Sequence, residues 1–343
     1  MYRLDRRRFL EQASGVVAGL ATGLTAASGQ SAGGLVFYDP AILRHEPSAD
    51  HPESPKRIDS VLRAVRLLEP RGRLAIASPQ PASDDHILLV HSSEYLKKVR
   101  TDIAAGRRTL STGDTEISPG SMGAALAAAG TVVSAVDAVM SGKTRRAFCA
   151  VRPPGHHASA NRGMGFCVFN NVAIAARHAQ RKHGVERVLI VDWDVHHGNG
   201  TQDVFWSDGS VMFFDTHQHP WYPGTGAPTE IGEGKARGLI VNNPFPAGSG
   251  RAQILKVFRE SLVPAAERFK PDLVMISAGF DSALGDPLGQ FTLIDADFAD
   301  FTDLVVAIAQ QFAGGRLVSV LEGGYNIATL PTLTFKHLER LAA

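Results

Sequence analysis

The chain has 343 residues, of which 44% are hydrophobic and 20% are charged, a composition typical of a globular protein. This length allows one large α/β domain or two small ones. The formal net charge of +1 gives the chain as a whole no electrostatic reason to bind nucleic acid, so we expect no nucleic-acid partner.

Residues 1–33 have the pattern of an export signal. Arg6, Arg7 and Arg8 precede a stretch without charged residues that is rich in Ala, Gly and Thr. Such a pattern predicts a twin-arginine-type signal peptide and therefore an exported, periplasmic protein. A membrane anchor is the alternative, but it needs about 20 strongly apolar residues. The stretch here is diluted by Gly, Ser and Thr, so we expect no membrane insertion after cleavage.

The remaining chain, residues 34–343, alternates between predicted strands and helices. It begins with a β-rich run at 34–38, and apolar residues at helical spacing predict helices at 58–68, 94–105 and 120–140. Five short apolar runs follow, at 147–151, 188–191, 211–214, 273–277 and 317–321, with helical stretches between them. Continuous apolar strands alternating with helices indicate a parallel sheet covered on both faces. We therefore expect one α/β domain.

Metal-binding and acid/base residue types follow four of the five runs. The four loops carry the sequences RPPGHH, DWDVHHGNG, GFDS and EGGY. In parallel α/β sheets, loops at the carboxyl ends of the strands form the site. The pattern therefore predicts that these loops meet at one edge of the sheet.

Three potential metal ligands alternate along the chain. Asp192, Asp194 and His196 share one face of an extended segment, and Asp281 follows another strand and can complete the set. Three protein ligands with a free position are typical of a catalytic zinc site. Carboxylate-rich sets also suit iron(II), cobalt and manganese, so the metal stays open. Two carboxylates would weaken the acidity of bound water, and a separate general base is therefore required.

His156 and His157 are candidates for that base, because they follow a stiff Pro-Pro-Gly turn and titrate near neutral pH. The alternative is a pair of structural histidines. Tyr325 follows two glycines on a loop that we expect to be flexible, where its phenol could reach an oxyanion, although such a sequence is usually a turn. Cys149 and Cys167 match no metal-binding spacing and are expected as buried thiols, with a disulfide as the alternative.

Together these motifs resemble the histone deacetylase and acetylpolyamine amidohydrolase superfamily, nearest to its class II-like bacterial members. The motifs RPPGHH, GFCxFNN, VDWDVHHGNGT, YPGTG, GFDSAxGDPLG and LEGGY occur in this order. The resemblance implies the arginase-deacetylase fold, a three-layer α/β/α sandwich around a mostly parallel sheet of about eight strands.

The resemblance also implies a zinc-dependent amidohydrolase that removes an acetyl or related acyl group from an N-acylated amine and releases acetate. An acetyl-lysine-like side chain, in a peptide or a small molecule, is the expected substrate. Acetylpolyamines are the alternative, and an acyl-lysine-binding module without turnover is a third interpretation. Zinc would be held by Asp194, His196 and Asp281, and potassium by the backbone carbonyls of Asp192, Asp194, His196, Asp215 and Thr216.

Five residues take catalytic roles by the same resemblance. His157 would act as general base and then as general acid, and His156 would assist electrostatically. Tyr325 would hydrogen-bond the carbonyl oxygen, and Asp192 would support His156 without binding the metal. Asn199 stands where class I enzymes have an aspartate, as it does in class II-like members, and is expected to tune the pKa of His157.

A narrow apolar channel is implied for the alkyl stem of the substrate. Phe166 and Tyr222 would form its walls beside Gly165, and Asp114 is similar to a rim aspartate that holds the substrate backbone. Arg57 resembles the arginine of an internal acetate-release path.

One channel residue bears on selectivity. Leu288 lies in the gatekeeper region, where polyamine-selective relatives have a glutamate, and therefore favours an uncharged stem. Met164 and Trp221 lie at the rim without an assigned role. The oligomeric state is left open.

Overall fold

The strands are short, mostly apolar segments that pair side by side. The computed structural model describes residues 33–343, and within them eight strands form one parallel sheet in the order β2-β1-β3-β8-β7-β4-β5-β6. The strands are β1 (Gly34–Phe37), β2 (Leu74–Ala77), β3 (Arg146–Cys149), β4 (Val188–Asp192), β5 (Val211–Gln218), β6 (Ile240–Phe245), β7 (Leu273–Ala278) and β8 (Leu317–Leu321). The inner strands β3, β4, β7 and β8 are buried throughout, as expected for a parallel sheet covered on both faces.

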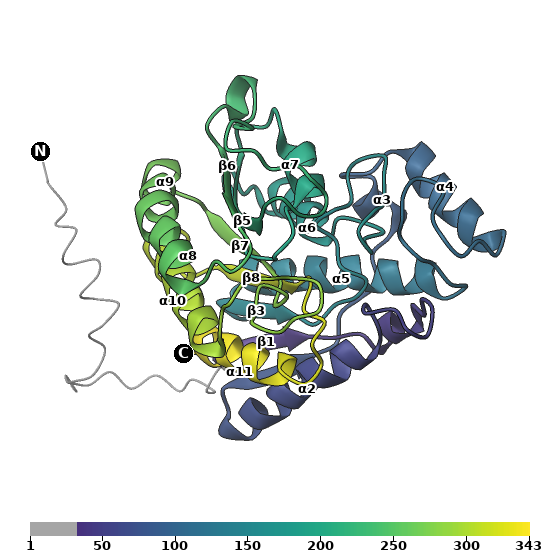
Figure 1. Ribbon diagram of the computed structural model, residues 1–343, viewed down its shortest axis with the longest axis horizontal. Helices are drawn as coiled ribbons and strands as arrows, with labels where there is room; N and C mark the ends of the chain where they lie inside the picture. The colour runs from purple at the N-terminus through teal and green to yellow at the C-terminus, as the bar shows by residue number, and fades with distance from the viewer. Residues whose placement is uncertain (1–32) are drawn as a thin grey trace, which may run out of the picture.

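Helices cover both faces of this sheet and complete a three-layer sandwich (Figure 1). One face carries α2 (Lys56–Leu68), α8 (Arg251–Val257), α9 (Val263–Phe269), α10 (Asp295–Phe312) and α11 (Leu330–Leu341). The other face carries α5 (Ser121–Met140), α6 (Asn171–His183) and α7 (Asn199–Phe205), with α3 (Asp84–Ile87) and α4 (Ser93–Ala104) beyond them. Right-handed crossovers explain this division, because connections toward the β6 edge and toward the β2 edge place their helices on opposite faces.

The predicted fold class is therefore confirmed, and most predicted elements fall within a few residues of their positions. Two strands, β2 and β6, were not predicted from the sequence. Both are edge strands, paired on one side only, and neither is fully buried. In β6, whose sequence is IVNNPF, two asparagines and a proline interrupt the apolar pattern, whereas β2 is a four-residue apolar run, LAIA, that was not recognised as a strand.

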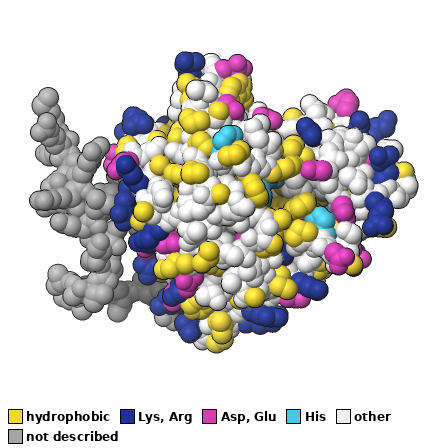
Figure 2. Space-filling view, in the orientation of Figure 1, with side chains coloured by type: hydrophobic (Ala, Val, Ile, Leu, Met, Phe, Trp, Pro, Cys, Tyr) yellow, Lys and Arg dark blue, Asp and Glu magenta, His cyan; other side chains and the backbone are white. Residues whose placement is uncertain are grey.

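Helix α5 is long and apolar enough to cross a membrane, yet 72% of its apolar window is buried inside the protein. It is therefore a core helix of the sandwich, packed against α6. The two cysteines are free and buried, which confirms the expected thiols. Figure 2 shows charged side chains of both signs around the margin of one face, with hydrophobic and uncharged surface in its centre.

Candidate metal and catalytic site

Strand register brings the four predicted loops together. Asp192, the last residue of β4, pairs with Ser277 of β7, and Ala278 of β7 pairs with Leu321 of β8. The loops that follow β4, β7 and β8 therefore start at the same level of the sheet. Cys149 at the end of β3 pairs with Val320, so the loop with the two histidines joins them.

Asp194, His196 and Asp281 form a buried cluster whose ligand atoms all lie within 4.8 Å of one another. His196 Nδ1 lies 3.0 Å from Asp194 Oδ1 and 3.1 Å from Asp281 Oδ2. Burial, and then the charge of Asp194, raise the pKa of Asp281 to about 7. Two buried carboxylates facing one another repel unless a proton or a cation lies between them, and their oxygens with an imidazole nitrogen form a set that fits a divalent metal ion.

Backbone amides hold the outer oxygens of this cluster. Asp194 Oδ2 accepts from the Gly323 amide at 2.8 Å, and Asp281 Oδ1 accepts from the Val195 amide at 2.9 Å. A Cβ atom on Gly323 would lie only 2.0 Å from Asp281 Oδ2, so no larger residue fits there. The Gly-Gly segment, expected as a flexible loop, instead packs directly against the metal-ligand candidates.

The two adjacent histidines are held by different partners. His156 Nδ1 donates to Asp192 Oδ2 at 3.0 Å, and His157 Nδ1 donates to Asn199 Oδ1 at 2.8 Å. Burial alone would lower the pKa of His156, but the charges of Asp194 and Asp192 raise it well above its usual value. Burial and the charge of His156 lower the pKa of His157. Opposite shifts in neighbouring groups are typical of acid/base sites.

A buried acid that the sequence analysis left without a role supports the histidine turn. Glu322 Oε2 accepts from the backbone amides of Gly155 at 2.6 Å and His156 at 3.1 Å. A carboxylate at the end of an otherwise apolar strand was the sequence signal that could have revealed it.

A pocket of about 260 Å³ opens onto this cluster. It is lined by Asp114, His157, Gly165, Phe166, His196, Trp221, Tyr222, Leu288 and Tyr325. His156, Asp192 and Asn199 are not among these residues and lie behind the wall. The structure thus gathers Asp114, Gly165, Phe166, Tyr222 and Leu288 at one cavity together with Trp221, whereas Met164, also expected at the rim, is not in the lining and instead contacts Asn199 Nδ2 at 3.6 Å.

Gly165 makes this pocket sterically possible. A Cβ atom there would lie 2.2 Å from His157 Cδ2 and 3.0 Å from Tyr222 Cε1. Gly165 and Phe166 both adopt the left-handed conformation, with φ of +56° and +69°. The turn that they form presents the Phe166 ring to the cavity. Asp114 braces the turn by accepting from the Gly165 amide at 2.7 Å and from the Tyr222 hydroxyl at 3.0 Å.

Arg57 lies behind Tyr325 rather than in the pocket lining. Its guanidinium lies 4.7 Å from the centre of the Tyr325 ring. Nε donates to the carbonyl oxygen of Gly324 at 2.7 Å, and a terminal nitrogen donates to the carbonyl oxygen of Glu322. Burial raises the pKa of the Tyr325 phenol, so this group stays protonated as a hydrogen-bond donor.

A second arginine, which was not predicted as a site residue, shares a buried carboxylate with Arg57. Glu53 lies 3.2 Å from Arg57 and accepts from Arg152 at 2.6 and 2.8 Å. Burial alone would raise the pKa of Glu53, but Arg152 holds it at about 2. The Glu53 carboxylate therefore stays ionised and ties the loop before α2 to the loop after β3.

Of the predicted potassium ligands, Asp192 ends β4, Asp194 and His196 follow it, and Asp215 and Thr216 lie within β5, where Asp215 pairs in register with Asp192. The Asp215 carboxylate already accepts from the Gly198 amide at 2.9 Å and contacts His217 Nδ1 at 2.6 Å. Its backbone carbonyl accepts from Asn243 Nδ2 at 2.9 Å.

Comparison with known proteins gives a consistent set of matches. The Histone deacetylase domain family matches residues 51–341. A probable deacetylase of Archaeoglobus fulgidus is 40% identical, covering 86% of this chain and 81% of its own. The chloroplastic histone deacetylase 14 of Arabidopsis thaliana is 39% identical, covering 86% and 74%. The human polyamine deacetylase HDAC10 is 41% identical over 81% of this chain and 43% of its own length. The crystal structure of the HDA15 HD domain superposes with a TM-score of 0.84 at 36% identity, covering 90% and 88%.

The prediction of export to the periplasm is wrong on this comparison. Two of the matched relatives are named as chloroplast proteins, and the relatives named above are not described as exported. Arginines ahead of a mildly apolar stretch form a short pattern that does not by itself specify a destination. The predicted signal peptide, residues 1–33, lies outside the described residues except for its last position.

Proposed function

Since the chain belongs to the histone deacetylase domain family, we propose that it is a zinc-dependent deacetylase whose substrate carries its acyl group on an uncharged, acetyl-lysine-like stem. Family membership establishes the coarser statement, namely a metal-dependent hydrolase that acts on acetylated amines. The narrower choice of metal and substrate is supported by the chemistry of the pocket.

The observation that carries the proposal is the convergence of His157, His196 and Tyr325 on one cavity with aromatic walls. A planar amide with an alkyl stem fits between Phe166 and Tyr222 with its carbonyl toward the buried cluster. Of the three candidate metal ligands, only His196 lines the pocket. Zinc held by these three residues would border the pocket at His196, and catalytic zinc sites keep one position free for water or substrate.

When bound, zinc would polarise the amide carbonyl and acidify water. His157 can accept the proton of the attacking water at Nε2, because its Nδ1–H is already donated to Asn199. The same nitrogen then returns the proton to the amine as the C–N bond breaks, which yields acetate and the free amine. The Tyr325 O–H donates to the carbonyl oxygen as negative charge develops there.

His156 contributes charge rather than proton transfer. It is absent from the pocket lining, and its ring lies 4.0 Å from that of His157, centre to centre. Asp192 fixes its orientation through Nδ1. We propose that the Asp192–His156 pair stabilises the negative charge of the reacting carbonyl from behind, because preorganised charges in buried sites need no reorganisation during the reaction.

Leu288 decides our choice of substrate class. It lines the pocket beside Trp221, whose Nε1 donates to the Leu288 carbonyl at 2.8 Å. The acidic group at the pocket is Asp114, and both of its oxygens are already occupied by Gly165 and Tyr222. Apart from Asp114, no carboxylate of the described residues lines the pocket to pair with a cationic polyamine stem. The similarity to a human polyamine deacetylase keeps acetylpolyamines as the second candidate.

The experiment compares kcat/KM for acetyl-lysine peptides, longer acyl-lysines, acetylputrescine and acetylspermidine on the zinc-loaded protein. We expect the acetyl-lysine peptides to be preferred. A higher kcat/KM for the acetylpolyamines would establish the second candidate instead. Zinc-loaded protein that binds acyl-lysine peptides without releasing acetate would support the binding-module interpretation.

Three further assignments belong to the same proposal. We propose a class II-like member on the basis of Asn199, which pairs with His157. We propose one catalytic domain over residues 34–343, supported by the single sheet and the family match. A potassium site beside the end of β4 and the adjacent part of β5 stays a prediction from the resemblance, and the Asp215 carbonyl that would contribute to it already accepts one hydrogen bond from Asn243.

A further inference from the structure

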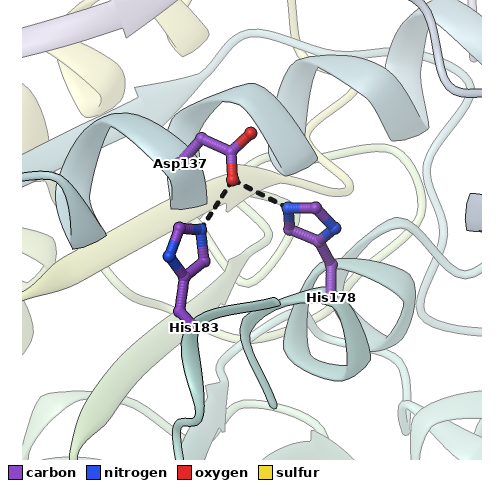
Figure 3. Close-up of side chains that lie close together, drawn as sticks. All are labelled: Asp137, His178 and His183. Atoms are coloured by element: carbon purple, nitrogen blue, oxygen red, sulfur yellow. Dashed lines mark hydrogen bonds and ion pairs between the residues drawn. The ribbon is translucent and has the colours of Figure 1, made fainter. Parts of the chain in front are cut away.

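A second cluster of metal-binding residue types lies where α5 meets the end of α6 (Figure 3). Asp137 belongs to α5, and His178 and His183 belong to α6. His178 Nε2 lies 2.8 Å and His183 Nε2 lies 2.7 Å from the same oxygen, Asp137 Oδ1. Both imidazoles therefore point at one carboxylate from a neighbouring helix. None of the three residues lines the catalytic pocket.

We propose that Asp137, His178 and His183 form a second binding site for a divalent transition-metal ion, with zinc as the best fit. Two imidazole nitrogens and one carboxylate oxygen are a ligand set that zinc, copper and nickel accept, whereas magnesium and calcium require more oxygens. All three potential ligand atoms already lie within 4.8 Å of one another. This site is independent of the proposed catalytic one, because it shares no residue with it.

The ligands of this second site are held by packed secondary structure. Helices α5 and α6 pack along one another, so Asp137 and His178 face each other across a fixed interface. His178 is only 6% exposed, which restricts its rotamers. His183 is the last residue of α6, and Gly184 follows in the left-handed conformation with φ of +66°. The chain therefore turns away at that point and leaves the His183 ring beside Asp137.

The other oxygen of Asp137 carries a competing cation. Lys182 Nζ lies 2.8 Å from Asp137 Oδ2. The Lys182 side chain is 54% exposed, so it can swing into solvent and release the carboxylate. A neighbouring cavity of about 450 Å³ is lined by His178 and Lys182 among others, so solvent reaches the His178 side of the cluster.

A hydrogen-bonded cluster without metal is the competing explanation of the same geometry. Distances of 2.7 and 2.8 Å suit two N–H groups donating to one oxygen. Ligands of a tetrahedral zinc ion, at about 2.0–2.1 Å from the metal, would lie about 3.3 Å apart. Binding therefore requires the Asp137 carboxylate to withdraw by about half an ångström, which rotation of a partly exposed side chain allows.

Equilibrium dialysis of the full-length protein against free zinc, with the bound metal counted by atomic emission, tests the proposal. We expect two ions per chain in the wild type and one in His183→Ala or Asp137→Asn. His86→Ala is the matched control, because its ring lies 5.2 Å from that of His178 but outside the ligand set, and it should keep two ions. Asp281→Ala should lose the catalytic ion and keep the second.

Lys182→Met should strengthen binding of the second ion, whereas the ligand variants should abolish it. Removal of the competing ammonium should lower the dissociation constant of the second ion by up to about 5-fold, the worth of a surface ion pair. In cobalt-loaded protein, the visible spectrum of wild type minus His183→Ala should show the bands of an imidazole-bound ion. A wild type that binds one ion would overturn the proposal, as would a second ion that persists in both His183→Ala and Asp137→Asn. Deacetylation should be unchanged in the His183 variant.

Discussion

Asp286 accepts the backbone amide of Tyr325 through Oδ2 at 2.7 Å. The same oxygen accepts the amide of Asn326 at 3.0 Å, and Oδ1 accepts the amide of Leu288 at 3.0 Å. One largely buried carboxylate therefore fixes both the catalytic phenol and the residue that we assign to substrate selection. Asp286 itself does not line the pocket. We regard it as a positioning residue that acts through Tyr325.

Asp286→Ala should lower kcat by about 10- to 100-fold, because small displacements of a reacting group are this costly. Zinc content and KM should change little. Tyr325→Phe should cost on the order of 10²-fold in kcat, by analogy with other oxyanion donors. The double variant provides the decisive measurement, since residues acting as one unit are non-additive. Fully additive losses in kcat would show that Asp286 does not act through Tyr325.

Gly165→Ala should reduce kcat/KM by at least about 100-fold, because its Cβ would displace His157 and narrow the channel at Tyr222. Gly142→Ala is a matched control. Gly142 also has positive φ, +77°, but nothing lies within 4 Å of its Cβ position. It should therefore lower the free energy of unfolding by about 1 kcal/mol and leave kcat/KM unchanged. Equal kcat/KM losses in both variants would contradict the steric role of Gly165.

Asp281→Ala should remove the catalytic metal and abolish acetate release, since it deletes one of three ligands. A chelator should inactivate the wild type, and added zinc should restore it. Asp137→Asn, at the distant second cluster, serves as the control and should retain deacetylation. Full activity of dialysed Asp281→Ala would refute the ligand assignment.

Leu288→Glu should shift selectivity toward acetylpolyamines, because it adds a carboxylate to the pocket wall opposite a cationic stem. We expect the ratio of kcat/KM for acetylspermidine to kcat/KM for an acetyl-lysine peptide to rise by about 10-fold. This factor corresponds to the free energy that a partly exposed charge pair contributes. Leu288→Gln has similar size without the charge and should not change the ratio. An equal change in both variants would mean that shape rather than charge controls selection.

Acid should destabilise the protein partly through His337. This side chain lies in the core between Thr302 Oγ1 at 2.7 Å and Ser319 Oγ at 2.8 Å, and burial lowers its pKa from 6.5 to about 3. The folded state thus holds His337 neutral, while the unfolded chain gains a proton as the pH falls below 6.5. The stability from neutral His337 is complete above pH 6.5 and declines until pH 3.

Urea unfolding of wild type and His337→Gln measures this contribution. The variant should be less stable near neutral pH, because its hydrogen bonds are altered. Between about pH 7.5 and pH 5, the free energy of unfolding of the variant should fall by about 2 kcal/mol less than that of the wild type. Parallel pH profiles for the two proteins would show that His337 titrates normally in the fold.

Local sequence patterns predicted much of the architecture and of the metal cluster. The inner strands are continuous apolar runs, and a parallel sheet forces the loops after them to one edge. Asp194 and His196 are two residues apart on an extended segment, so their proximity follows from backbone geometry. Of the two edge strands, β6 is interrupted by two asparagines and a proline, and the apolar run of β2 is only four residues long.

The sequence by itself thus determined the fold class, the metal-ligand candidates and the pair of acid/base histidines. Only the tertiary structure decided which polar groups support them. Asp286 and Tyr325 are 39 residues apart, and Asp114 and Tyr222 are 108 apart. The cluster of Asp137 with two histidines likewise depends on how α5 packs against α6. Periodicity encodes the direction of a side chain within its own element, but such contacts depend on which loops and helices meet, and no local spacing records that.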